Sequence, residues 1–242
     1  QVNWDSKQGE VIARRELRIG ALTLEWRPIA MDDVRDEIVS VVCEAAHRDG
    51  LSMFDFAAAE VQRLQLRLAS LQRWHPEEEW PDLSTAALLQ RADEWLPLYI
   101  GKATTAQALK KIDLTEVMWG LLSYEQQQRA DFLAPTHITV PTGSRIRVDY
   151  RQGAEAPIVS VRLQECFGMS DTPRVDEGRR PVLMELLSPG FKPVQLTQDL
   201  RSFWQSTYFE VRKELRRRYP KHFWPDTPTE APPTRGVVKR TP

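Results

Sequence analysis

The stretch DLRSFWQSTYFEVRKELRRRYPKHFW, Asp199–Trp224, combines a helical repeat of apolar residues with a basic and aromatic end. On a helical wheel of about 100° per residue, one side collects an apolar stripe: Trp204, Tyr208, Val211 and Leu215. The opposite side collects cations: Lys213, Arg216 and Arg217. We therefore predict a helix from about Asp199 to Tyr219 that packs one face on a core, turns a basic face to solvent, and stops before Pro220.

Upstream of this helix the apolar residues follow the period of two that is typical of strands. Short strands are predicted in HITVP, SRIRVDYR and IVSVRL, and PVLMELLS is apolar enough to be a more central strand. SPGFKP is a turn, and VQLTQDL leads into the closing helix. In the second strand Ile146, Val148 and Tyr150 point one way, and the other face carries Arg145, Arg147, Asp149 and Arg151. A small, mostly antiparallel sheet covered by the helix is expected.

The first half of the chain begins as a hairpin and continues as helices. GEVIARRELRIGALTLEWRPI reads as two strands that break at Gly20 and place Trp26 on an apolar face, which must pack on later parts of the chain or on a preceding domain. Helices follow, with Gly50 as a stop and Ser84 as a cap. The predicted class is α+β, in four parts: a β-hairpin (1–30), a helical region (31–113), an α+β domain (114–228) and a disordered tail (229–242).

Charge is unevenly distributed along the chain. The 242 residues carry a net charge of −1, so the whole molecule exerts no strong pull on nucleic acid or membrane. From Arg201 onward, however, ten basic residues face four acidic ones. No apolar run is long enough to span a bilayer, and the N-terminus lacks the layout of a signal peptide. Two isolated cysteines fit a reducing compartment, so the expected location is cytoplasmic.

A search for catalytic and metal-binding patterns finds none. The Gly101–Lys102 pair lacks the upstream glycine and the following hydroxyl of a P-loop. None of the four histidines has a partner histidine or cysteine at metal-ligand spacing. Cys166 lies in an apolar setting typical of a structural cysteine, and Glu77–Glu79 reads as a solvated acidic turn. We expect no catalytic residue, no metal site and no cofactor site in this chain.

The basic C-terminal stretch supports two interpretations. Arginines in a last helical turn stabilise the helix dipole, and Glu214 can pair with Arg218; the aromatic residues can fasten the chain end to the core. Alternatively, the cations bind a phosphate backbone and the aromatics stack on bases. The candidates for phosphate contact are Arg145, Arg147, Arg151, Lys213, Arg216, Arg217, Arg218 and Lys221. The candidates for stacking are Tyr219, Phe223 and Trp224.

Several long strings carry a family resemblance. They include LLSYEQQQRADFLAPTHITVPTGSRIRVDY (121–150), VRLQECFGMSDTPRV (161–175) and the stretch from PVLMELLSPGFKP to RRRYPKHFWPDTP (181–228). This sequence resembles the C-terminal region of the HrpB family of bacterial ATP-dependent helicases, which are DEAH-box RNA helicases. The resemblance implies two RecA-like motor domains upstream, which bind ATP and magnesium in the parent protein, and makes the hairpin the tail of an OB-like domain. No ATP-site residue transfers to this chain.

Two functions follow from these observations. The leading hypothesis is a non-catalytic accessory region that contacts single-stranded nucleic acid, RNA rather than DNA, and supports the motor of the same chain. The rival is a protein-interaction or intramolecular docking module that regulates the motor without binding nucleic acid. An independent enzyme is the weakest reading, because no residue can be named for it.

Overall fold

The structure, a computed structural model, describes residues 1–237. The chain divides into two compact units that share the helix α2 (Ala59–Trp74). Unit 1 comprises Gln1–Gln65 and Pro81–Ser123, and unit 2 comprises Leu66–Trp80 and Tyr124–Pro242. The sequence places domain boundaries at residues 30, 113 and 228, where the apolar period or the composition changes. These boundaries stay a prediction.

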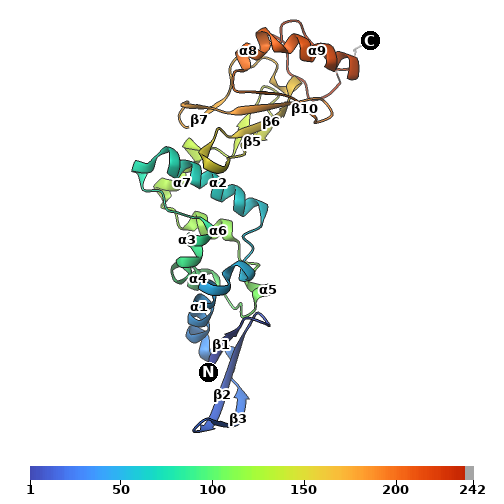
Figure 1. The fold of residues 1–242 in the computed structure, drawn as a ribbon. Coiled ribbons are helices and arrows are strands. Elements are labelled where there is room, and N and C mark those ends of the chain that lie inside the picture. Colours follow the sequence, from blue (N-terminus) through green and yellow to red (C-terminus); the bar gives the residue numbers. More distant parts are fainter. Residues whose placement is uncertain (238–242) are drawn as a thin grey trace. The chain divides into compact units, whose positions relative to one another are not determined.

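Unit 1 combines a three-stranded antiparallel sheet with a group of helices (Figure 1). The strands, in spatial order, are β1 (Val2–Asp5), β2 (Glu10–Ile19) and β3 (Leu22–Pro28). The helices are the short 3-10 helix η1 (Met31–Val34), α1 (Arg35–Met53), the first part of α2, α3 (Thr85–Gln90), α4 (Ala92–Tyr99), α5 (Ala106–Leu109) and α6 (Leu114–Gly120). The predicted hairpin is β2–β3, and β1 is a strand that the polar N-terminal sequence did not reveal.

Helix α1 forms the centre of unit 1 and packs against α4 and β1. Its buried residues are Ile38, Val42, Cys43, Ala45, Ala46, Gly50 and Met53. The prediction that Gly50 stops this helix is wrong, since α1 continues to Met53. A Cβ on Gly50 would lie 2.3 Å from Cδ2 of Leu89, so the glycine serves close approach of α3 rather than termination. Ser84 caps α3 as predicted, its hydroxyl accepting a hydrogen bond from the Ala87 amide.

Unit 2 contains the second part of α2, further helices and three small sheets. Its helices are η2 (Pro76–Glu78), α7 (Tyr124–Leu133), η3 (Gln152–Ala154), η4 (Leu163–Cys166), α8 (Leu200–Gln205) and α9 (Thr207–Arg218). Its strands are β4 (His137–Thr139), β5 (Arg145–Arg147), β6 (Ile158–Arg162), β7 (Arg174–Val175), β8 (Arg180–Pro181), β9 (Leu183–Leu187) and β10 (Pro193–Thr197). β4–β5 and β7–β8 are two-stranded antiparallel sheets, and the third sheet has the order β10-β9-β6.

The strand β9 is central, as its continuous apolar sequence predicts. It pairs with β10 in antiparallel and with β6 in parallel orientation. Met184 and Leu186 on β9, and Val159 on β6, are fully buried. VQLTQDL, expected only to lead into the closing helix, instead supplies the edge strand β10. The predicted α+β class is confirmed.

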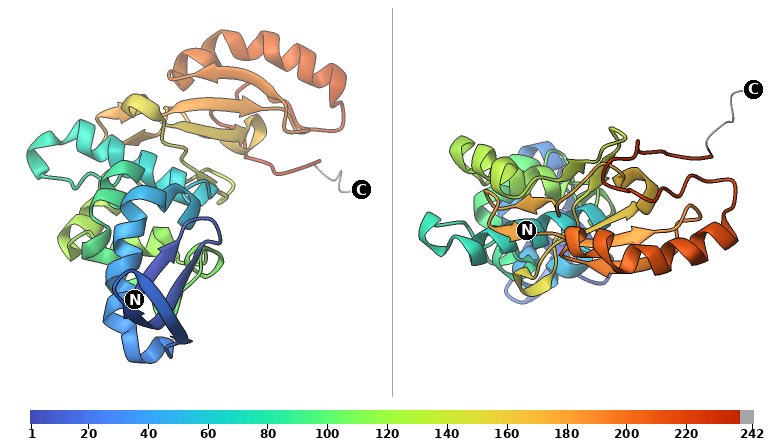
Figure 2. Two further views of the ribbon diagram at one scale, coloured as in Figure 1. Left: turned by 60° about the horizontal axis from the view of Figure 1, so that its bottom comes forward. Right: turned by 90° about the horizontal axis from the view of Figure 1, so that it is seen from above.

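The closing helix lies along one face of this sheet as two segments, α8 and α9 (Figures 1 and 2). The break falls at Ser206, whose ψ of −75° and φ of −131° depart from helical values. Trp204, Tyr208 and Leu215 are buried, so the predicted stripe faces the core. The indole Nε1 of Trp204 donates to the Met169 carbonyl at 2.8 Å.

Residues 229–237, part of the segment predicted to be disordered, are attached to unit 2. Ala231 is buried, and the Thr234 amide donates to the Gln164 carbonyl at 3.0 Å. Arg235 donates from Nη2 to the Thr142 carbonyl at 2.7 Å. The prediction of disorder is therefore wrong for residues 229–237. Their polar, proline-rich composition favours disorder, but these contacts hold the segment on unit 2. Residues 238–242 of the same tail lie outside the described residues.

Truncation of the central strand tests this core. Leu186 is fully buried on β9, whereas Leu196 on the edge strand β10 is 55% exposed. We expect Leu186→Ala to lower the free energy of unfolding by about 2–5 kcal/mol. Leu196→Ala, the matched control, should change it by less than about 0.5 kcal/mol. Urea unfolding followed by circular dichroism measures both, and equal losses would contradict the central position of β9.

Candidate nucleic-acid interface

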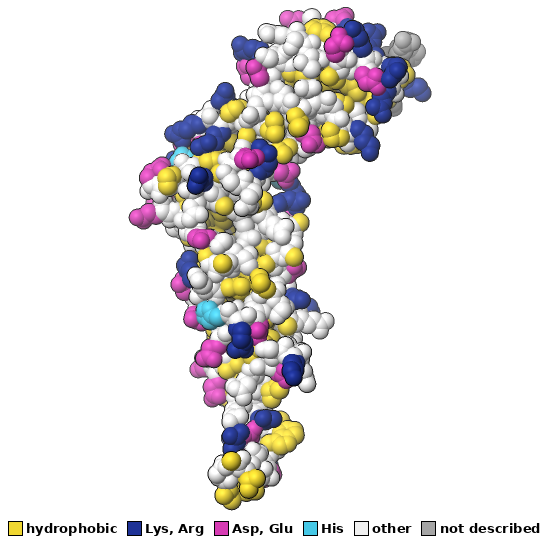
Figure 3. All heavy atoms as spheres, in the orientation of Figure 1, with side chains coloured by type: hydrophobic (Ala, Val, Ile, Leu, Met, Phe, Trp, Pro, Cys, Tyr) yellow, Lys and Arg dark blue, Asp and Glu magenta, His cyan; other side chains and the backbone are white. Residues whose placement is uncertain are grey.

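Helix α9 positions the basic side chains by burying its opposite side. Tyr208 is fully buried, and its hydroxyl donates to the Pro225 carbonyl at 2.8 Å. Leu215 is buried one turn from the helix end. Because both anchors face the core, the charged residues of the final turns are held toward solvent. Lys and Arg side chains gather on this part of unit 2 in Figure 3.

Some of the cations have acidic partners on the same helix. Lys213 pairs with Glu210 at 3.0 Å, and Arg217 pairs with Glu214 at 2.8 Å. The sequence predicted Arg218 as the partner of Glu214, and the structure shows Arg217 one residue earlier. Exposed pairs of this kind contribute only about 0–1 kcal/mol. A phosphate group can therefore replace the carboxylate at small cost.

Three cations at the end of α9 have no ion pair among the described residues: Arg216, Arg218 and Lys221. The helix dipole places only about half a negative charge at a C-terminus. One arginine is enough to balance that charge, so the dipole leaves most of this positive charge uncompensated. Stabilisation of the helix therefore explains only part of the basic cluster. It does not explain why these three cations are exposed without an ion pair.

The strand arginines form a separate set. Arg145 and Arg147 are exposed on β5, on the face opposite the buried Val148 and Tyr150, as the alternation predicts. β5 belongs to the β4–β5 sheet and not to the sheet that α9 covers. Arg151 is engaged in its own loop, where Nε donates to the Ala156 carbonyl at 2.8 Å and Nη1 pairs with Glu155 at 2.9 Å. Arg151 is thus a loop-stabilising residue in this conformation.

The three aromatic candidates differ in exposure. Trp224 is buried, donates from Nε1 to the Tyr219 carbonyl at 3.0 Å and meets Phe167 edge-to-face. It fastens the chain end to the core, so its ring faces are not available for stacking in this conformation. Tyr219 is half-buried, with its hydroxyl 3.3 Å from the Ser188 hydroxyl. Phe223 is 38% exposed and is the most accessible of the three.

Sequence reasoning missed two further residues near this cluster. Phe191, in the SPGFKP turn, is 65% exposed, and the Arg162 guanidinium lies 4.9 Å from the centre of its ring. The sequence predicts only a turn for this stretch. The sequence does contain a signal for an exposed ring. Phe191 lies between a glycine and a lysine in a tight turn, where a large side chain cannot reach the core.

A second group of charges surrounds His75 in unit 2. Nε2 of the buried imidazole lies 2.5 Å from the Asp176 carboxylate, and Nδ1 faces Glu77 at 3.3 Å and Glu78 at 3.5 Å. Three arginines complete the group. Arg180 pairs with Asp176 at 2.9 Å, and Arg179 pairs with Glu177 at 3.2 Å. Arg129 pairs with both Glu78, at 2.9 Å, and Glu177, at 2.8 Å. The prediction of a merely solvated acidic turn is wrong for Glu78, which is half-buried and paired.

The same histidine and two glutamates could in principle hold a metal ion. The ligand atoms of His75, Glu77 and Glu78 lie within 4.8 Å of one another, a donor set that zinc accepts. Arg129 already pairs with the Glu78 carboxylate, however, and the raised pKa of His75 keeps its imidazole protonated, whereas a metal ligand must be neutral. These contacts favour an ion-pair network with a charged imidazole over a metal centre.

The two cysteines are buried and free. Burial, with the nearby Asp93 carboxylate, raises the pKa of the Cys43 thiol to about 11. Burial, with Glu165, raises the pKa of the Cys166 thiol to about 12. Protonated thiols are poor nucleophiles, which favours the structural role predicted for Cys166.

Family models match both ends of the chain. A model described as "ATP-dependent helicase C-terminal" matches residues 95–228, and one described as "ATP-dependent RNA helicase HrpB, connector region" matches residues 1–29. This chain belongs to the HrpB family. It corresponds to the C-terminal region of HrpB-family proteins, and the resemblance seen in the sequence is confirmed.

Individual HrpB proteins agree with this assignment. The Escherichia coli (strain K12) "ATP-dependent RNA helicase HrpB" is 40% identical over 238 residues, which are 98% of this chain but 29% of the relative. A crystal structure of the E. coli DExH-box NTPase HrpB superposes with a TM-score of 0.81 over 100% of this chain and 29% of that chain, at 40% identity. A second, of the E. coli DEAH/RHA helicase HrpB, gives 0.70 over 93% of this chain and 28% of that chain, at 39% identity. The chain thus spans less than a third of the HrpB proteins it matches.

No helix in the described part of the chain is long and apolar enough to cross a membrane.

The His75 network predicts a specific pH dependence of stability. Burial lowers the pKa of His75, but the hydrogen bond and charge of Asp176 outweigh it and raise the pKa above its usual value. The stabilisation is therefore complete below the unfolded pKa of about 6.5 and is lost as pH rises through the folded pKa. Burial raises the pKa of Asp176, but the hydrogen bonds and charges of His75 and Arg180 outweigh it and lower the pKa below its usual value. The stabilisation from Asp176 is therefore lost as pH falls through its folded pKa.

We expect His75→Gln to lower the free energy of unfolding by about 1.5–3 kcal/mol at pH 6, since it removes a buried bond to a charged group. The loss should shrink as pH rises above neutrality. Urea unfolding at several pH values measures the difference, and His137→Gln, at a half-buried histidine outside this network, is the control. A loss that is constant from pH 6 to 9 would contradict a charged imidazole.

Proposed function

We propose that this chain is a non-catalytic accessory region of an HrpB-type ATP-dependent RNA helicase, and that the end of α9 contacts single-stranded nucleic acid beside the motor. The observation that carries this proposal is the set of three exposed cations without an ion pair among the described residues: Arg216, Arg218 and Lys221. Lys213 and Arg217, in weak pairs with neighbouring glutamates, can join them.

The geometry suits a phosphate backbone better than a single anion. The three cations lie within six residues: Arg216 and Arg218 are in the last turn of α9, whose other side is buried, and Lys221 is in the turn that follows. A flexible strand can run past such a cluster and meet successive charges, and each contact releases a counterion. Arg145 and Arg147 on β5 offer a second, smaller set of contacts in the same unit.

ATP and magnesium belong, in this proposal, to the motor domains of the parent helicase. No residue of this chain is assigned to them. The Gly101–Lys102 pair follows helix α4, whereas a P-loop connects a strand to a helix. The chain supports catalysis by holding or orienting the strand, and RNA is favoured over DNA because the E. coli relative carries the name of an RNA helicase.

Neutralising the three cations tests the proposal. If all three contact phosphates, the slope of log affinity against log salt concentration should become shallower by about 2, at roughly 0.7 for each contact with a single strand. The variant is Arg216→Gln, Arg218→Gln, Lys221→Gln, and the measurement is fluorescence anisotropy of a labelled RNA oligomer in increasing salt. Lys102→Gln, Lys110→Gln, Lys111→Gln changes the net charge equally at exposed positions of unit 1 and is the control. Affinity without salt dependence would contradict the proposal.

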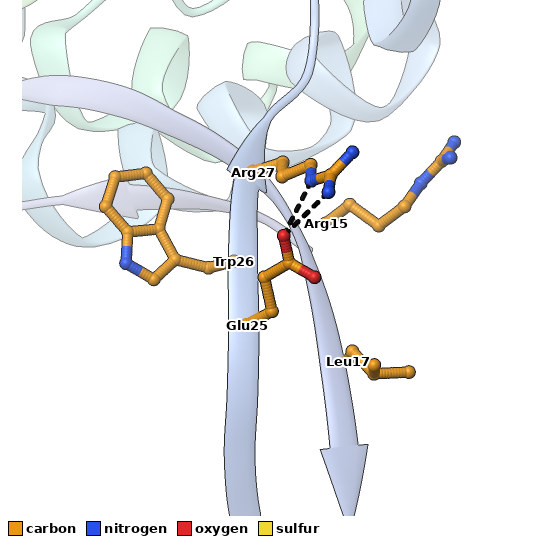
Figure 4. A pocket seen from close by; sticks show the side chains of 5 residues that line it. All are labelled: Arg15, Leu17, Glu25, Trp26 and Arg27. Atoms are coloured by element: carbon orange, nitrogen blue, oxygen red, sulfur yellow. Dashed lines mark hydrogen bonds and ion pairs between the residues drawn. The ribbon is translucent and has the colours of Figure 1, made fainter.

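A second candidate function, docking onto the motor or another protein, is favoured by the hairpin of unit 1. Five large apolar side chains on β2 and β3 are more than half exposed: Leu17, Ile19, Leu22, Leu24 and Trp26. Hydrophobic side chains gather at the free end of the hairpin (Figure 3). A shallow hollow of about 210 Å³ on this hairpin is lined by Arg15, Leu17, Glu25, Trp26 and Arg27 (Figure 4). Trp26 is 63% exposed in the described chain, which leaves a surface for a partner.

Mixing this chain with the motor portion of its parent helicase tests the docking function. We expect Trp26→Ser to weaken binding by about 30-fold or more, since truncation of a central aromatic residue costs about 2 kcal/mol or more at an interface. Isothermal titration calorimetry measures the affinity. Leu98→Ser is the control, because Leu98 is 80% exposed on α4. Equal affinities for the two variants would count against docking through the hairpin.

A further inference from the structure

The turn between β9 and β10 holds an aromatic residue in an unfavourable backbone conformation. Phe191 has φ of +61°, in the left-handed region. Its amide donates to the Ser188 carbonyl at 2.9 Å, and the Ser188 amide donates to the Lys192 carbonyl at 2.8 Å. Large residues rarely adopt this conformation because Cβ approaches the following carbonyl oxygen. Burial of the ring does not compensate, since 65% of the side chain is exposed.

The exposed ring is held in place by a cation. The Arg162 guanidinium lies 4.9 Å from the Phe191 ring centre, and Nε of the same arginine donates to Glu165 at 3.1 Å. Glu165 in turn accepts hydrogen bonds from Thr142 at 2.9 Å and Ser144 at 2.7 Å. These hydrogen bonds hold Arg162 in place, and Arg162 in turn orients the Phe191 ring in the absence of a ligand.

The same turn is attached to the basic end of α9. The Tyr219 hydroxyl lies 3.3 Å from the Ser188 hydroxyl. A Cβ on Gly190 would lie 2.7 Å from the Tyr219 hydroxyl oxygen, so the glycine permits this close approach. Tyr219 directly follows Arg216–Arg218 and precedes Lys221 by two residues.

We propose that Phe191 is a stacking platform for one base of a single-stranded nucleic acid whose phosphates lie on the cations at the end of α9. This inference rests on the proposed function and adds to it a residue and a mode of contact. A ring that is exposed, oriented by a guanidinium and joined to a cluster of unpaired cations matches the requirements of single-strand binding, in which aromatic faces take bases and cations follow the backbone. A protein partner would not need this combination of a presented ring and excess positive charge.

The strained backbone supplies a clean variant. Glycine adopts φ of +61° without a Cβ contact, so Phe191→Gly removes the ring and relieves the strain. We expect the unfolding midpoint of Phe191→Gly to equal or exceed that of the unmodified chain. Its affinity for a labelled oligouridine should fall by about 5- to 150-fold, the equivalent of about 1–3 kcal/mol for one stacked base. Phe191→Trp should retain the affinity.

An abasic oligomer of equal length separates stacking from charge. The unmodified chain should bind oligouridine more tightly than the abasic strand, and Phe191→Gly should bind the two strands equally with an unchanged salt slope. Phe132→Ala is the control, because Phe132 is 64% exposed on α7. If the unmodified chain binds neither strand, the proposed function and this inference both fail. If it binds both equally and Phe191→Gly has no effect, only the stacking platform is overturned.

Discussion

The arrangement of the C-terminal half depends on the packing around one buried ring, Phe167. Its ring centre lies between 6.1 and 6.5 Å from those of four aromatic residues: Trp204, Tyr208, Phe223 and Trp224. These partners come from α8, α9 and the segment after α9, so one side chain fixes three pieces of chain on the sheet. Aromatic pairs at these distances add about 0.5–1.5 kcal/mol each beyond the area they bury. Loss of this ring would release the helix and the chain end together.

This packing determines which charges are exposed. With Tyr208 and Leu215 turned to the core, α9 cannot rotate to pair its terminal arginines with acidic groups of the sheet. The two acidic residues on its own surface, Glu210 and Glu214, each take one cation. Arg212 is withdrawn separately, to Asp226 and the Pro225 carbonyl. The unpaired charge at Arg216, Arg218 and Lys221 is thus a consequence of core packing and of the limited number of nearby carboxylates.

The sequence predicts the elements of this half well because the apolar periods are strong and local. It places the stripe of α9, the alternation in β5 and the central position of β9 correctly. It cannot predict that Trp224 would be buried and Phe223 exposed, since both follow a proline in an aromatic stretch without a period. The His75 network was invisible for a related reason: His75 and Asp176 are 101 residues apart, and their pairing follows from tertiary packing alone. Gly50 was misread because a helix-breaking residue and a close-packing residue look the same in a sequence.

The two candidate functions do not compete for the same residues. The exposed apolar side chains lie on β2 and β3 of unit 1, whereas the unpaired cations and Phe191 lie in unit 2. Apolar burial suits a lasting contact with protein, because salt does not screen it as it screens charges. Contacts between cations and phosphates form quickly, and they weaken as the salt concentration rises. Such contacts suit a nucleic-acid strand that must move. In the two functions proposed above, the apolar surface of unit 1 would hold a protein partner, while the cations of unit 2 would exchange contacts with a nucleic-acid strand.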